Sequence, residues 1–153
     1  MKNNSRPFHI KLIVGVYATG MLTLILLAAS NYRVQWRDQV NHERLRYLEV
    51  FAQAITYYRL DHGGDLFPMP AETSIISNTD QCSYACPSLG TSLPCYNITE
   101  HLVPSYMKRI LQDPMLTSDS DTGFYITEDD GQVTLGACHH FFNKPIRHTV
   151  PLQ

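Results

Sequence analysis

Residues 43–64 read ERLRYLEVFAQAITYYRLDHGG and predict a helix with one apolar face. The apolar side chains recur at steps of three and four residues, which places them along one side of an α-helix. The polar residues, Arg44 and Glu49 among them, are expected on the other faces. Gly63 and Gly64 follow, and glycine readily adopts the left-handed conformation that ends a helix. We expect the apolar face to pack on a small sheet through Leu45, Leu48, Phe51, Ala52, Ile55 and Tyr58.

A long uncharged stretch precedes this helix. Residues 12–32 read LIVGVYATGMLTLILLAASNY and lie between Lys11 and Arg33. About 20 apolar residues are enough for a helix to cross the hydrocarbon core of a bilayer. Because no Pro or Gly interrupts residues 21–62, we expect one continuous helix that leaves the membrane. Two helices joined by a bend near Ser30 are the alternative.

The charges beside the uncharged stretch indicate its orientation. Basic residues and no acidic ones precede it, which favours an N-terminus in the cytoplasm. We therefore expect a single-pass protein of the inner (cytoplasmic) membrane, with the C-terminal domain periplasmic or extracellular. The expected segments are a basic N-terminus (1–11), a transmembrane helix (12–32), its amphipathic continuation (33–62) and a globular region (63–153). The alternatives are a signal peptide cleaved near Ser30 and a buried core helix.

The composition limits the class of protein. The chain has 153 residues, which is a length for one domain. Its formal net charge of -2 excludes a strongly basic nucleic-acid-binding protein, so we expect no nucleic-acid partner.

Four cysteines follow the uncharged stretch: Cys82, Cys86, Cys95 and Cys138. An even number of cysteines outside the cytoplasm indicates two disulfides. Three pairings are possible, and if all four cysteines are bonded, one bridge must join the segment 82–95 to Cys138. A zinc site that includes His139 and His140, and a catalytic thiol, are the alternatives.

No motif typical of an enzyme is present in the sequence, which lacks GxSxG, HExxH and the glycine-rich nucleotide loops. We therefore expect no catalytic activity, no cofactor and no metal. A calcium site formed by Asp113 with residues 119–121 is an alternative, but the spacing is not that of an EF-hand. A solvated turn is the prediction for residues 119–121.

The remaining sequence predicts a loop, a helical turn and a hairpin. Residues 68–94 are rich in Ser, Thr and Pro, and we expect an irregular loop there. Asn97 or Thr99 is expected to cap a short helical turn.

Apolar and polar side chains alternate in residues 124–127 and 133–137, on either side of a Glu-Asp-Asp-Gly turn, which predicts a β-hairpin. We expect Phe141 and Phe142 to extend the core. Residues 143–153 are expected to form an edge strand or a loose tail.

Several segments share their order and spacing with one known family. They are residues 54–68 (AITYYRLDHGGDLFP), 102–107 (LVPSYM) before Asp113-Pro114, 123–126 (GFYI) and 133–138 (VTLGAC). In this order they resemble the type IV pilin-like proteins, the pseudopilins especially.

The resemblance implies a fold and a role. Proteins of this family have an N-terminal membrane helix that continues as an amphipathic helix against an antiparallel sheet, an α+β fold. It implies a non-enzymatic structural or interaction subunit of a pilus or of a type II secretion-like assembly for protein secretion. The implied partners are the lipid bilayer, other pilin-like subunits and secretion-machinery proteins. A membrane-tethered domain that binds a ligand or metal outside any filament is the alternative.

The chain departs from the family at its processing signature, a Gly followed by a Phe-Thr-Leu-Ile-Glu-like run. Here residues 20–25 read GMLTLI, so that Ile25 stands where the family has a glutamate. Cleavage after Gly20 would also leave too little apolar length to span a bilayer. The departure predicts a pilin-like domain that stays in the membrane.

Overall fold

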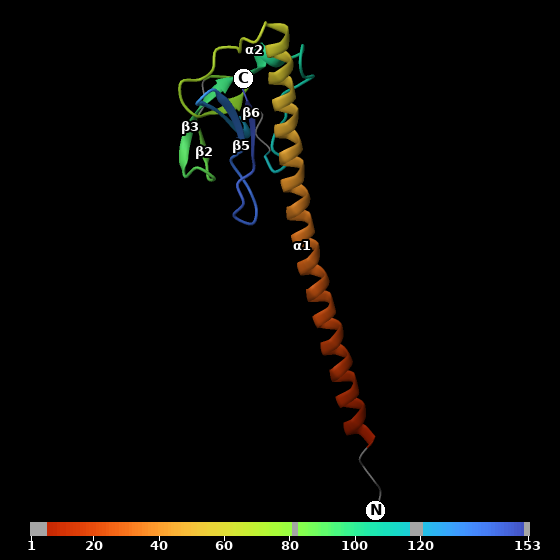
Figure 1. Ribbon diagram of the computed structural model, residues 1–153. Helices are drawn as coiled ribbons and strands as arrows, with labels where there is room; N and C mark the ends of the chain where they lie inside the picture. Colours follow the sequence, from red (N-terminus) through yellow and green to blue (C-terminus); the bar gives the residue numbers. More distant parts are fainter. Residues whose placement is uncertain (1–5, 81–82, 117–120, 152–153) are drawn as a thin grey trace, which may run out of the picture. The chain divides into compact units, whose positions relative to one another are not determined.

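The computed structural model describes residues 6–80, 83–116 and 121–151, with the backbone alone for residues 6–14 and 16. The chain divides into two compact units, Met1–Asp38 and Gln39–Gln153. Helix α1, Arg6–Asp61, runs without a break from the first unit into the second (Figure 1). One continuous helix, rather than two helices, is therefore confirmed.

In the first unit, the described apolar side chains of α1 are exposed. Six large ones are between 58% and 70% exposed: Met21, Leu22, Leu24, Ile25, Leu26 and Leu27. Over the residues that can be assessed, α1 has no segment with the length and hydropathy of a membrane span.

The second unit contains one sheet of six strands in the order β2-β3-β1-β4-β5-β6. The strands are β1 (Ser74–Ser77), β2 (Ser83–Cys86), β3 (Thr91–Asn97), β4 (Asp121–Asp129), β5 (Gln132–Ala137) and β6 (Arg147–Pro151). A short helix, α2 (Thr99–Leu102), follows β3. Together with α1, the sheet makes the α+β fold that the sequence predicts.

Two expectations for the sheet are wrong. Residues 68–94 contain β1, β2 and the start of β3 rather than an irregular loop. The sheet is also not wholly antiparallel, because β1 pairs with β3 in parallel. All four residues of β1 are buried, so this strand lacks the alternation of polar and apolar residues by which a half-exposed strand is recognised.

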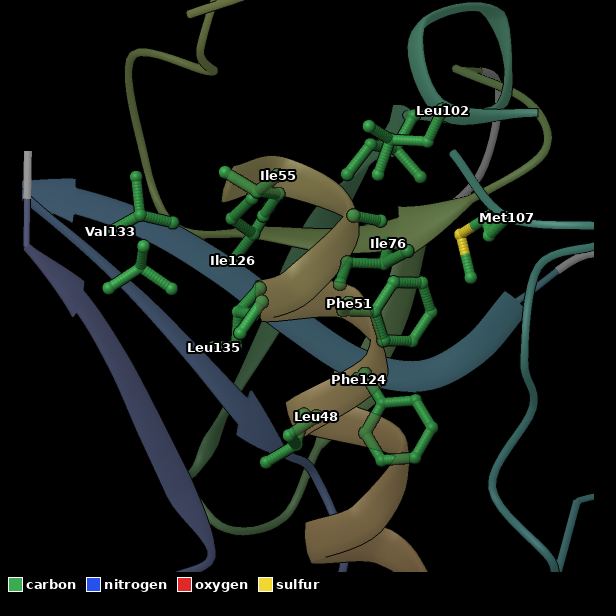
Figure 2. Close-up of a cluster of buried hydrophobic side chains, with 14 of the residues drawn as sticks. Leu48, Phe51, Ile55, Ile76, Leu102, Met107, Phe124, Ile126, Val133 and Leu135 are labelled. Atoms are coloured by element: carbon green, nitrogen blue, oxygen red, sulfur yellow. The ribbon is translucent and has the colours of Figure 1, made fainter. Parts of the chain in front are cut away.

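The part of α1 in the second unit packs on the sheet through an apolar stripe. Leu48, Phe51, Ala52 and Ile55 are at most 5% exposed and contact residues of β1, β4 and β5, including Ile76, Phe124, Ile126, Val133 and Leu135 (Figure 2). Burying one such side chain stabilises a fold by about 1.5–3 kcal/mol. Tyr58 is half-buried at the end of the stripe, where it stacks on His62.

Three side chains lie elsewhere than expected. Leu45 is half-buried and does not belong to the core cluster. Phe142, which was expected to extend the core, is 54% exposed. Arg44 was expected on a polar face and is instead 1% exposed.

The helix end and the hairpin turn follow the local sequence. Gly63 has a φ of 69°, and the N–H of Gly64 donates to the carbonyl of Arg59 at 2.8 Å, a Schellman cap. In the hairpin, Asp130 and Gly131 have φ angles of 47° and 70°, as a type I′ turn requires. The predicted end of the helix and the predicted hairpin turn are therefore both confirmed.

Arg44 is buried because it pairs with Asp113. Its Nε and Nη2 donate to the two carboxylate oxygens of Asp113 at 2.7 and 3.0 Å, and both side chains are at most 1% exposed. The Nη1 donates to Asn41, and the guanidinium lies 5.2 Å from the ring centre of Phe141. Fork-shaped pairing of this kind holds two elements in one orientation.

We expect Arg44→Ala to lower the free energy of unfolding by about 3–5 kcal/mol, because it leaves the Asp113 carboxylate buried without a countercharge. The matched control is Arg46→Ala. Its guanidinium is 65% exposed and lies 3.8 Å from Glu43, so its loss should cost less than ~1 kcal/mol. Urea unfolding of the oxidised chain measures both, and equal losses would contradict the account.

Candidate functional site

The end of β5 brings together the cysteines and histidines that the sequence singles out. Cys138 follows β5 and forms a disulfide with Cys86 at the end of β2, with 4.6 Å between their Cα atoms. This is the bridge between the segment 82–95 and Cys138 that the cysteine count requires. Cys95, in β3, is also disulfide-bonded, while Cys82 lies outside the described residues.

A second hydrophobic cluster surrounds these sulfurs. It consists of Ile75, Cys86, Leu93, Cys95, Tyr125 and Cys138. Neighbouring strand residues point to opposite faces of a sheet, so Ile75 lies on the face away from Ile76 and α1. The disulfides therefore cover the face of the sheet that α1 leaves open.

Gly136 makes room for the largest member of this cluster. Tyr125 lies directly opposite Gly136 in the β4–β5 pairing. A Cβ at position 136 would lie 2.2 Å from Cζ of Tyr125, well inside contact distance. The glycine thus lets the tyrosine ring lie across β5.

The two histidines after Cys138 have different surroundings. Nε2 of His139 lies 2.9 Å from the hydroxyl of Tyr84, at hydrogen-bond distance. Burial raises the pKa of the Tyr84 hydroxyl above its ordinary value, and the negative charges of Asp121 and Asp113 raise it further. Nδ1 of His140 is buried and makes no hydrogen bond.

The cysteine sulfurs are not available for metal or nucleophilic chemistry. Cys86, Cys95 and Cys138 are all oxidised, and the thiolate is the form of cysteine that binds zinc or attacks a substrate. The zinc and catalytic-thiol alternatives are therefore wrong for these three residues. In the described ranges, no three His, Cys, Asp or Glu side chains lie close enough to hold a metal ion.

The residues considered for a calcium site have different surroundings. Asp113 accepts from Arg44 and, through Oδ1, from the N–H of Met115 at 2.8 Å, so its oxygens are occupied within the fold. Asp121 is 6% exposed, and its Oδ1 makes no hydrogen bond. Asp119 and Ser120 lie outside the described residues. Asp113 therefore acts as a structural anchor.

Sequence reasoning missed Arg44 and Asn41. Arg44 lies four residues before Leu48 and seven before Phe51, so it continues the inward face of α1 by one turn. That spacing is the signal that predicts an inward side chain at position 44, although its charge argues for the surface. Nothing in the sequence names Asp113 as its partner.

Comparisons of the chain with protein-family models, with curated proteins and with solved structures found no match. The pilin-like α+β architecture therefore rests on the fold described here.

We expect removal of the Cys86–Cys138 bond by a double serine substitution to destabilise the chain by about 4 kcal/mol. The bond joins residues 52 positions apart, and closing a longer loop removes more entropy from the unfolded chain. The matched control is Cys82→Ser with Cys95→Ser. These are the remaining two cysteines, only 13 positions apart, so their removal should cost about 3 kcal/mol. Denaturant unfolding without reductant measures both, and a larger loss for the control would refute the ranking.

Proposed function

We propose that this chain is a non-enzymatic, pilin-like subunit held in the inner membrane by residues 12–32. Its N-terminus faces the cytoplasm, and its disulfide-bonded domain lies in the periplasm or outside the cell. In this role it is a structural or interaction subunit of a pilus or of a type II secretion-like assembly. Its partners are the bilayer, other pilin-like subunits and proteins of the secretion machinery.

One observation carries the proposal: the apolar side chains of α1 lie exposed in the first unit. Residues 21–27 present Met, Leu and Ile side chains on every side of the helix, and Leu24 is 67% exposed. A soluble monomer does not leave so many neighbouring apolar side chains in water. Lipid, or the same helix of neighbouring subunits, is the environment that suits them.

The disulfides support a location outside the cytoplasm for the second unit. Disulfides persist in oxidising compartments and are rare in the cytoplasm. The described cysteines are all disulfide-bonded, which suits a domain that lies outside the cytoplasm.

The organisation of the second unit supports a structural role. Two of its buried charged residues, Arg44 and Asp113, join α1 to the chain before β4, and the Cys86–Cys138 disulfide joins the ends of β2 and β5.

The anchor is tested by flotation of the full chain with phospholipid vesicles. We expect Leu24→Arg to abolish flotation, because an arginine at the centre of a membrane helix costs about 2.5–3.5 kcal/mol. The matched control is Leu60→Arg, since Leu60 is equally apolar and 71% exposed but lies in the second unit. Flotation of Leu24→Arg at the wild-type level would contradict the anchor.

The subunit role is separated from the tethered-domain alternative by photo-crosslinking. A benzophenone amino acid in place of Tyr17, which is 73% exposed, is activated in the native membrane. We expect crosslinks to the N-terminal helix of another pilin-like chain, identified by mass spectrometry. Crosslinks to lipid alone would favour the tethered domain.

A further inference from the structure

A small cavity lies in the second unit where β1 ends and β4 begins. The end of β1 pairs with the start of β4, so that Ser77 lies opposite Asp121. Residues of α2 and of the chain between α2 and β4 complete the lining, and the volume is about 280 Å³. Pockets that hold small molecules commonly measure about 300–1,000 Å³, so this cavity suits a ligand of few atoms.

Two residues that line this cavity have a buried polar atom without a hydrogen-bond partner. The atoms are Oδ1 of Asp121, a side chain that is 6% exposed, and Oγ1 of Thr99. A carboxylate oxygen that loses its water on burial destabilises the fold unless another group replaces that water. Among the described residues, only one further buried side-chain atom lacks a partner, and it lies on His140, away from this cavity. Such a concentration at one cavity indicates a binding partner for the two oxygens.

Hydrogen bonds fix the chain around the two unpartnered oxygens. The hydroxyl of Thr122 donates to the carbonyl of Ile76 at 2.6 Å, and the N–H of Ile98 donates to the carbonyl of Ser77 at 3.2 Å. The N–H of Asp113 donates to the carbonyl of Thr122 at 2.8 Å. The segments that carry Asp121 and Thr99 are therefore held against β1, and the site is formed before any ligand binds.

The cavity also has two positively charged side chains in its lining, Lys108 and Arg109. Both residues are exposed, whereas Met107 before them is 7% exposed and packs in the core (Figure 2). In the part of the chain that the structure describes, neither Lys108 nor Arg109 forms an ion pair. With two positive charges and one negative charge, the lining repels a simple cation and suits a ligand that carries both signs.

We propose that this cavity binds a free α-amino acid with a short aliphatic side chain. The ammonium group of the ligand donates to Oδ1 of Asp121 and to Oγ1 of Thr99. Its carboxylate accepts hydrogen bonds from Lys108 and Arg109. Charge-assisted hydrogen bonds of this kind are the strong ones, and the ammonium gives the buried carboxylate of Asp121 the countercharge that the fold does not supply.

The rest of the lining favours the short aliphatic side chain. Val103 and Ile110 line the cavity and are both half-buried, so they offer apolar surface next to the charged groups. Every residue that forms the site lies in the second unit. The inference therefore goes beyond the proposed subunit role and does not depend on the membrane anchor.

The test is isothermal titration of the full oxidised chain in detergent micelles with L-alanine and L-valine. We expect at least one of the two to bind. N-acetyl-L-valine lacks the ammonium group and L-valinamide lacks the carboxylate. Each should bind at least tenfold more weakly than L-valine, because each loses charge-assisted hydrogen bonds.

Variants of the lining locate the binding site. We expect Asp121→Asn to weaken binding at least tenfold without lowering the unfolding midpoint, because Oδ1 of Asp121 has no partner in the fold to lose. Its matched control is Asp129→Asn, at the exposed end of the same strand. Lys108→Gln should also weaken binding, whereas Lys144→Gln, exposed and outside the cavity, should leave it unchanged.

Three results would overturn the proposal. The first is no binding of either amino acid up to about 10 mM, which would leave the cavity to water. The second is equal binding of L-valine, N-acetyl-L-valine and L-valinamide, or wild-type affinity in Asp121→Asn. The third is binding of Ca²⁺ by the wild-type chain that Asp121→Asn abolishes, which would assign the cavity to a cation.

Discussion

The buried pair of Arg44 and Asp113 fixes how α1 meets the sheet. A charged group that is only 1% exposed is tolerated only when an opposite charge lies next to it. If the helix slid or rotated, both groups would stay buried without a partner. Asp113 is itself held by backbone bonds: its N–H donates to the carbonyl of Thr122 at 2.8 Å, and its Oδ1 accepts from the N–H of Met115. The pair therefore sets the start of β4 as well as the helix.

The same cluster reaches the β5–β6 segment through Asn41, which accepts from Arg44 and binds the backbone of Phe141. One turn of α1 thus positions two segments that are about 70 and 100 residues away in sequence. On the other face of the sheet, the disulfide between Cys86 and Cys138 likewise links two segments that are distant in sequence. The ion pair thus joins α1 to the chain before β4, and the disulfide joins the ends of β2 and β5.

The sequence predicted the elements whose signals are local. The steps between Leu48, Phe51 and Ile55 are a helical period, and Gly63 and Gly131 mark ends that need a positive φ. It did not predict β1, because a strand covered on both faces has no polar alternation. Nor did it predict the role of Arg44, since the burial of a charge depends on a carboxylate 69 residues away. The pairing of Cys86 with Cys138 was one of the possibilities left open, since pairing follows from the fold.

The proposed role requires that residues 12–32 are retained, since they form the proposed anchor. The most direct measurement is the intact mass and N-terminal sequence of the protein isolated from its native membrane without reductant. The account predicts that residues 12–32 are present, that no cleavage has occurred after Gly20, and that the mass is lower than that of the reduced chain by two disulfides. An N-terminus near Asn31, or a protein found only in the soluble fraction, would contradict it.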